Sequence, residues 1–116
     1  MKVVFEALLV PARISCPVYL KKIDESLGTC QIHVCGNVES VSFEDWHVFL
    51  NDEADYLPLP LNPRAEVLIR EAGAGLGRPI RGNAVFLGHD ANGDATDVPD
   101  YLRKLASALF ETRWAA

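Results

Sequence analysis

A double-proline segment, Tyr56 to Leu61, constrains the fold of this chain more than any other feature of its sequence. Proline lacks the backbone N–H that a sheet ladder requires, so this segment cannot be a strand inside a sheet. The next residues, Asn62-Pro63, are typical of a helix start, with the asparagine as N-cap and the proline at the first helical position. Apolar residues then recur at helical spacing as far as Gly73, which is expected to end the helix.

Short apolar or alternating segments on both sides of this helix predict strands. The expected strands are residues 2–10, 18–23, 38–43, 46–50 and 83–87. A charged turn at 51–55, a flexible loop at 73–77 and a polar loop at 89–97 are expected to connect elements. A last helix is expected to start near Val98-Pro99, with one apolar face that consists of Leu102, Leu105, Ala106, Leu109 and Phe110.

The segment Ser26 to Cys35 fits two structures equally well. Cys30, Ile32 and Val34 alternate with polar residues, which favours a strand. The same segment also has an apolar face at helical spacing, with Asp24 or Ser26 as a cap before it and Gly36 as a stop after it. The residues alone leave both alternatives open.

The order of these elements is strand, strand, uncertain helix, strand, strand, helix, strand, helix. It lacks regular βαβ alternation, which favours the α+β class over α/β. We expect a single domain over residues 1–116, with a small mixed or antiparallel sheet of about five strands packed by two to three helices.

Composition and charge argue against several classes of protein. A net charge of −5, with the basic residues scattered, disfavours nucleic-acid binding, and it is too small for a DNA mimic. No apolar run is long enough to span a membrane. The N-terminal segment meets Glu6 after three apolar residues, so we expect no signal peptide and a cytoplasmic location.

Three motifs suggest metal or phosphate chemistry at first sight, and each has a simpler explanation. Cys30-x2-His33-x-Cys35, with Cys16, offers zinc ligands but lacks paired knuckles. The glycines at 73–77 follow a helix, whereas a phosphate-binding loop follows a strand. The loop from Asp90 lacks the glycine and glutamate positions of an EF-hand. We therefore expect no metal and no cofactor.

No catalytic centre can be recognised in the sequence. The serines lack a nucleophile elbow, and no cysteine lies in a recognisable hydrolase context. The three histidines are single and without a supporting group nearby in the sequence. We therefore expect a protein that is not an enzyme.

One group of polar residues is a candidate ligand-binding site. It consists of Glu39, Asn51, Glu53, Asn62 and Arg64. These residues lie near predicted strand ends, where Arg64 can engage an anion in a polar pocket. In the alternative, which we favour, Asn62 caps a helix, Asn51 makes a turn, and Arg64 pairs with Glu39 or Glu53.

Five features, in this order, resemble a family of small domains found in phages, plasmids and actinobacterial genomes, the domain of unknown function family 3846. They are Leu27-x3-Gln31-x2-Val34-x-Gly36-x-Val38-Glu39; Asn51-Asp52-Glu53; Leu61-Asn62-Pro63-Arg64-Ala65; Gly82-Asn83-Ala84-Val85; and Gly88-x-Asp90. The resemblance implies that 26–34 is a helix. It also implies an accessory protein of a phage or mobile element that acts inside a bacterium. Cys35 departs from the pattern, because a second glycine is expected there.

The leading hypothesis is a non-enzymatic accessory protein that binds a host bacterial protein. Its contact surface is expected to use aromatic and apolar side chains: Trp46, Phe49, Tyr56, Leu57 and Trp114. One alternative is a protein that binds or sequesters a nucleotide or metabolite. A further alternative is a self-associating structural protein, such as a homodimer.

Overall fold

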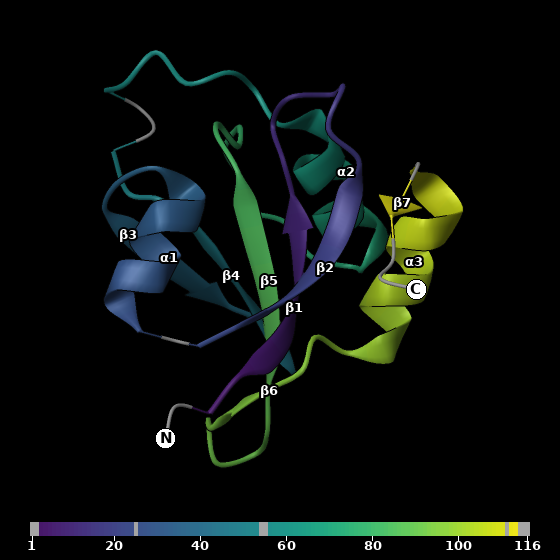
Figure 1. The fold of residues 1–116 in the computed structure, drawn as a ribbon. Coiled ribbons are helices and arrows are strands. Elements are labelled where there is room, and N and C mark those ends of the chain that lie inside the picture. Colours follow the sequence, from purple (N-terminus) through teal and green to yellow (C-terminus); the bar gives the residue numbers. More distant parts are fainter. Residues whose placement is uncertain (1–2, 25, 54–55, 111, 114–116) are drawn as a thin grey trace.

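The computed structural model describes residues 3–24, 26–53, 56–110 and 112–113. Three helices and seven strands lie in this part of the chain (Figure 1). In chain order they are β1 Phe5–Val10, β2 Val18–Ile23, α1 Leu27–Val34, β3 Val38–Ser42, β4 Trp46–Asn51, α2 Pro63–Glu71, β5 Ala84–His89, β6 Ala95–Thr96, α3 Asp100–Leu109 and β7 Thr112–Arg113.

All the strands belong to one sheet, in the order β3-β4-β5-β1-β2-β7, with β6 paired to β5. Neighbouring strands are antiparallel, except that β7 runs parallel to β2. The prediction of an α+β fold with a small sheet and three helices is therefore confirmed. The two-residue strands β6 and β7 were not predicted, because so short a strand carries no alternation pattern.

One face of the sheet carries α2 and α3, and the main core lies beneath these helices. Strand β4 shows why: its alternate residues Trp46, Val48 and Leu50 point to this face, where they join Phe86 of β5 and Leu102 of α3. Helix α3 starts at Asp100, close to the predicted position, and buries Leu102 and Ala106. Leu109, which was assigned to the same apolar face, is 39% exposed.

The other face of the sheet carries α1, so the helical alternative for residues 26–34 is confirmed. Ser26 is its N-cap and accepts a hydrogen bond from the Thr29 N–H. Cys30 and Val34, four residues apart, lie on the same side of the helix and pack against Leu9 and other side chains of the sheet. The helix is favoured over the strand because this packing buries both side chains. The residues alone could not show this tertiary contact.

Helix α1 ends on a strained residue. Cys35 has φ 63° and ψ 40°, a left-handed conformation that costs a non-glycine residue about 1–2 kcal/mol. A glycine at this position would adopt it without that cost. The departure of this chain from the family pattern therefore falls at the helix terminus where glycine is favoured.

None of the described helices is both long enough and apolar enough to pass through a bilayer.

Candidate functional site

The predicted site residues lie along the side of the sheet at which strands end or begin, rather than along an outer strand. Because neighbouring strands are antiparallel, β1 and β4 end at this edge and β2, β3 and β5 begin there (Figure 1, top). The segments 11–17, 52–62 and 72–83 connect elements at the same edge. We call it the strand-end edge.

Asn51, the last residue of β4, is buried and joins β4 to α1. Its Nδ2 donates to the carbonyls of Val34 and Cys35, at 3.1 and 3.3 Å, and its Oδ1 accepts from the Glu53 N–H at 2.8 Å. The predicted turn-forming role is therefore right, and a second role was missed. The amide also satisfies carbonyls at the C-terminus of α1, which have no partner inside the helix.

Asn62 caps α2, as predicted, and is fully buried. Its Oδ1 accepts from the Ala65 N–H at 3.1 Å. Its Nδ2 donates to the carbonyls of Val10 and Gly82, both at 2.9 Å. One side chain thus joins the start of α2, the end of β1 and the approach to β5, and no hydrogen-bonding capacity of the Nδ2 group is left for a ligand.

Asn83 has a similar role that the sequence analysis did not assign. Its Oδ1 accepts from the Ala12 N–H at 3.0 Å, and its Nδ2 donates to the His33 carbonyl at 3.2 Å. It therefore connects the loop after β1 with α1. The available signal was its position: like Asn51 and Asn62, it lies at the boundary of a regular element.

Arg64 does not pair with Glu39 or Glu53, so that part of the prediction is wrong. Its Nη2 donates to the carbonyls of Pro11 and Arg13, at 2.7 and 3.0 Å, and so holds the loop between β1 and β2 against α2. Its Nε is buried and has no hydrogen-bond partner among the described residues. Burial lowers the pKa of Arg64 from its usual value.

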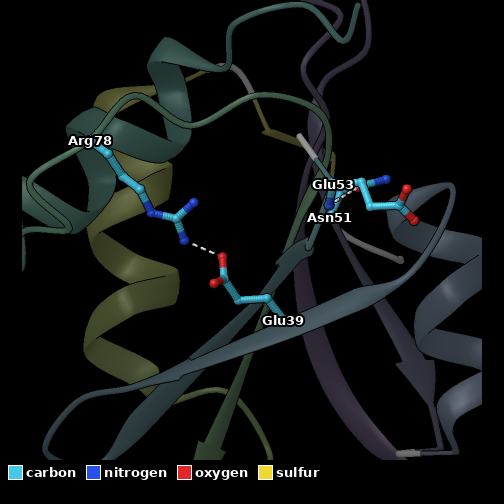
Figure 2. A network of polar contacts seen from close by, with 4 residues as sticks. All are labelled: Glu39, Asn51, Glu53 and Arg78. Atoms are coloured by element: carbon cyan, nitrogen blue, oxygen red, sulfur yellow. Dashed lines mark hydrogen bonds and ion pairs between the residues drawn. The ribbon is translucent and has the colours of Figure 1, made fainter. Parts of the chain in front are cut away.

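Glu39 pairs with Arg78 instead. Figure 2 shows Arg78 reaching from the loop after α2 to the Glu39 carboxylate on β3. Glu53 lies beyond the end of β4 and accepts a hydrogen bond from Asn37 Nδ2 at 2.6 Å. The Glu53 carboxylate points away from Glu39 in this view.

The five predicted ligand residues therefore share an edge without converging on one cavity. Two of them, Asn51 and Asn62, are buried connectors, and Arg64 binds loop carbonyls. A pocket of about 410 Å³ lies next to them, lined by Glu66, Ile69 and Arg70 of α2 and by residues 74–80. Arg78 belongs to this pocket, and through it Glu39 lies near the pocket rim.

The predicted contact residues divide into buried and exposed groups. Trp46 and Phe49 are only 2% and 8% exposed, which corrects their assignment to a contact surface. Both lie on a central strand, β4, where each face of the sheet is covered. Tyr56 and Leu57, the first two residues of the double-proline segment, are 86% and 38% exposed. Trp114 lies outside the described residues.

The three cysteines are free thiols in different surroundings. Cys30 is buried against the sheet, Cys35 is exposed, and Cys16 is half-buried in the loop after β1. Burial, with a smaller contribution from Lys21, lowers the pKa of His33, which shares α1 with Cys30. In the described part of the chain, no three His, Cys, Asp or Glu side chains are grouped as metal ligands would be.

Comparisons with known proteins bear on the fold more than on the activity. No curated protein matches the chain. A crystal structure of the small RNA methyltransferase HEN1 is similar, with a TM-score of 0.64 and 14% sequence identity. The match covers 92% of this chain but only 16% of that one, so it shows a shared fold and nothing of the methyltransferase activity. A family model described as a domain of unknown function (DUF3846) matches residues 5–111.

Proposed function

The chain belongs to the DUF3846 family of domains of unknown function, and we propose that it is a non-enzymatic protein that binds another protein through its strand-end edge. The observation that carries this proposal is that four apolar side chains on the loops of that edge are each exposed. Ile14 is 70% exposed, Tyr56 86%, Leu57 38% and Leu61 49%. We call these four residues the apolar patch.

Two loops supply the apolar patch, and hydrogen bonds hold both to the rest of the edge. Arg64 holds the loop that contains Ile14 by its bond to the Arg13 carbonyl. Leu61 pairs with Arg81, whose Nη1 also donates to the Leu59 carbonyl at 3.2 Å. A surface whose loops are already fixed loses less conformational entropy on binding, which favours association.

Two arginines flank the apolar patch. Arg13 precedes Ile14 in the sequence, and Arg81 pairs with Leu61. The edge as a whole has mixed charge, because Asp52 and Glu53 lie in the segment before Tyr56. Acidic side chains on a partner would complement the two arginines. The partner in this proposal is therefore a protein with an apolar contact and acidic side chains opposite Arg13 and Arg81.

The setting expected from the family resemblance is part of the same proposal. An accessory protein of a phage or mobile element, acting in the bacterial cytoplasm, would bind a host protein by this edge. Tyrosine and arginine are enriched at the residues that dominate protein interfaces. Tyr56 and Arg81 therefore carry most of the predicted affinity.

Site-specific photo-crosslinking in bacterial cytosol tests the proposal. A photoreactive residue at Tyr56 should crosslink a protein, while one at Ala108, on the exposed side of α3, should not. With the captured protein purified, Leu61→Asp should weaken binding at least tenfold, and Ala108→Asp should leave it unchanged. Binding should also weaken as salt is raised.

Other occupants of the edge are distinguishable outcomes that overturn the proposal. Crosslinking of RNA or DNA from Tyr56 would replace a protein partner by a nucleic acid. Crosslinking of the chain to itself would show a homodimer if the mass measured by light scattering is also that of two chains at high concentration and falls toward that of one chain on dilution. Equal crosslinking from both positions would remove the strand-end edge as the contact.

A second candidate function rests on the pocket of about 410 Å³ beside α2. Ile69, Leu76 and Ile80 give it apolar walls, and Arg70 and Arg78 are both exposed where they line it. A small ligand with an apolar body and an anionic group fits this combination. A nucleotide or an acidic metabolite has this chemistry.

Thermal unfolding with a panel of such ligands tests the second candidate. A ligand at a hundred times its dissociation constant adds about 2.7 kcal/mol to the free energy of unfolding. Gly75 lines the pocket, and a Cβ there would meet no atom within 4 Å, so Gly75→Leu can fill the pocket without a clash. The shift should vanish in Gly75→Leu and persist in Leu61→Asp.

A further inference from the structure

A histidine pair lies at the far end of β4 from the strand-end edge. His47 of β4 and His89 of β5 approach with their Nδ1 atoms 3.0 Å apart. His47 is only 6% exposed, while His89 is half-buried. Both line a hollow of about 270 Å³ together with Ser40, Ser42 and Gly93. The pair is separate from the residues used in the proposed function.

A backbone carbonyl determines where the proton of this pair lies. His89 Nε2 is 3.2 Å from the Glu44 carbonyl oxygen, which can only accept a hydrogen bond, so Nε2 carries the proton of a neutral His89. His89 Nδ1 then has a lone pair, and His47 Nδ1 donates the proton between the two rings. One proton therefore lies between the two nitrogens. It is bonded to His47 Nδ1 and accepted by the lone pair of His89 Nδ1.

We propose that a divalent transition-metal ion takes the place of this proton, bound by His47 Nδ1 and His89 Nδ1. A metal–imidazole bond is about 2.0–2.1 Å long, so two adjacent ligands of one ion lie about 2.9–3.4 Å apart. The observed 3.0 Å falls in this range. The bond from His89 Nε2 to a carbonyl is also the arrangement that usually orients a metal-binding histidine.

Metal binding requires the two rings to turn and the proton on His47 Nδ1 to leave that nitrogen. The ring centroids are 5.2 Å apart and the planes are inclined by 23°, so the two nitrogens face each other and the rings must turn for both lone pairs to reach one ion. The ion replaces the proton on His47 Nδ1, and that proton is released to solvent or taken up elsewhere on the ring.

The surroundings favour a cation and leave room for water ligands. Segments 42–47 and 88–97 contain five acidic residues and no lysine or arginine. The hollow has space for several water molecules, each of about 30 Å³, beside the hydroxyls of Ser40 and Ser42. Imidazole ligands select Zn²⁺, Ni²⁺ and Cu²⁺ over Mg²⁺ and Ca²⁺.

Calorimetric titration of the chain with Zn²⁺, with Co²⁺ as a spectroscopic probe, tests the proposal. The parent should bind one ion, and His89→Gln should weaken binding at least tenfold while its unfolding midpoint stays near that of the parent. His33→Gln and Cys35→Ser are the matched controls, a histidine and an exposed thiol on or next to α1, and should bind like the parent.

Four results would overturn the metal site. Three are no binding by the parent, equal binding by His89→Gln, and loss of binding in either control. The fourth is a Co²⁺ spectrum with thiolate-to-metal charge transfer, which would assign the ion to a cysteine. None of these results bears on the partner of the strand-end edge, since that test uses different residues.

Discussion

The side-chain amide of Asn62 donates a hydrogen bond to the backbone carbonyl of Val10, 2.9 Å away and 52 residues earlier in the chain. Both groups are completely buried. The bond ties the start of α2 to the end of β1, where the loops of the strand-end edge begin. Buried polar groups are costly unless they are paired, so this side chain stabilises the edge on which the proposed contact depends.

Replacing Asn62 by alanine should therefore be among the more destabilising single changes in this chain. The variant loses the cap of α2 and leaves the carbonyls of Val10 and Gly82 without their donor. The expected loss is about 2–4 kcal/mol in the free energy of unfolding, measured by urea denaturation.

Two further variants separate the roles of this residue. Asn62→Asp retains the oxygen that caps α2 but cannot donate to the two carbonyls, so most of the loss should remain. Asn37→Ala removes an exposed hydrogen bond to Glu53 and should change stability by less than about 0.5 kcal/mol. If Asn62→Asp is as stable as the parent, the cap of α2 alone accounts for the contribution of Asn62 to stability.

Gly88→Ala should destabilise the pairing of β5 with β6. A Cβ at this position would overlap the Asp97 carbonyl oxygen and the Thr96 Oγ1, and a backbone oxygen cannot move away easily. We expect a loss of about 1–3 kcal/mol, the usual cost of overpacking. Gly75→Ala, whose Cβ meets open space, is the control and should be nearly neutral.

Tyr101 should make stability fall at alkaline pH. Tyr101 is 46% exposed, so its burial is partial; this partial burial and the 2.5 Å hydrogen bond to Asp45 raise the pKa of Tyr101 above its usual value. The folded state thus retains a proton that the unfolded state loses as pH rises through about 10, so this contribution is complete below that pH and is lost above it.

Unfolding by urea between pH 8 and 11 measures this effect. Tyr101→Phe should show a shallower decline in stability across that range than the parent. Tyr56→Phe, which changes an exposed tyrosine, should decline as the parent does. Parallel curves for the parent and Tyr101→Phe would contradict the assignment.

Removing the ion pair between Arg78 and Glu39 should cost little. Both side chains are about a third exposed, at 36% and 29%, and exposed ion pairs contribute at most about 1 kcal/mol. The free energy of unfolding of Arg78→Ala should therefore lie within about 0.5 kcal/mol of that of the parent. A markedly larger loss by urea denaturation would show that Glu39 and Arg78 hold the sheet edge together.

The candidate site was predicted in part, and the reason differs from residue to residue. The cap formed by Asn62 could be recognised because a cap is local, as could the turn at Asn51. The second bonds of these side chains could not, because their partners Val10 and Val34 are 52 and 17 residues away. The partner of Arg64 was predicted wrongly for the same reason.

Exposure was equally hard to predict for the aromatic residues. Trp46 and Tyr56 both lie next to acidic residues in the sequence, and both suggested a contact surface. Strand β4 lies between β3 and β5, which places Trp46 beneath the helices, while the double-proline segment places Tyr56 on a loop. Neighbours in the sheet, rather than neighbours in the chain, decide which of the two is buried.

The sequence by itself determined the α+β class, the helix capped by Asn62, the amphipathic last helix, and the exclusion of the double-proline segment from the sheet. These properties follow from local backbone chemistry and from periodicity over a few residues. The tertiary structure alone decided that residues 27–34 are helical, that β6 and β7 join the sheet, and that His47 meets His89. Each of these depends on contacts between distant segments, whose free energy exceeds the weak local preferences that the sequence displays.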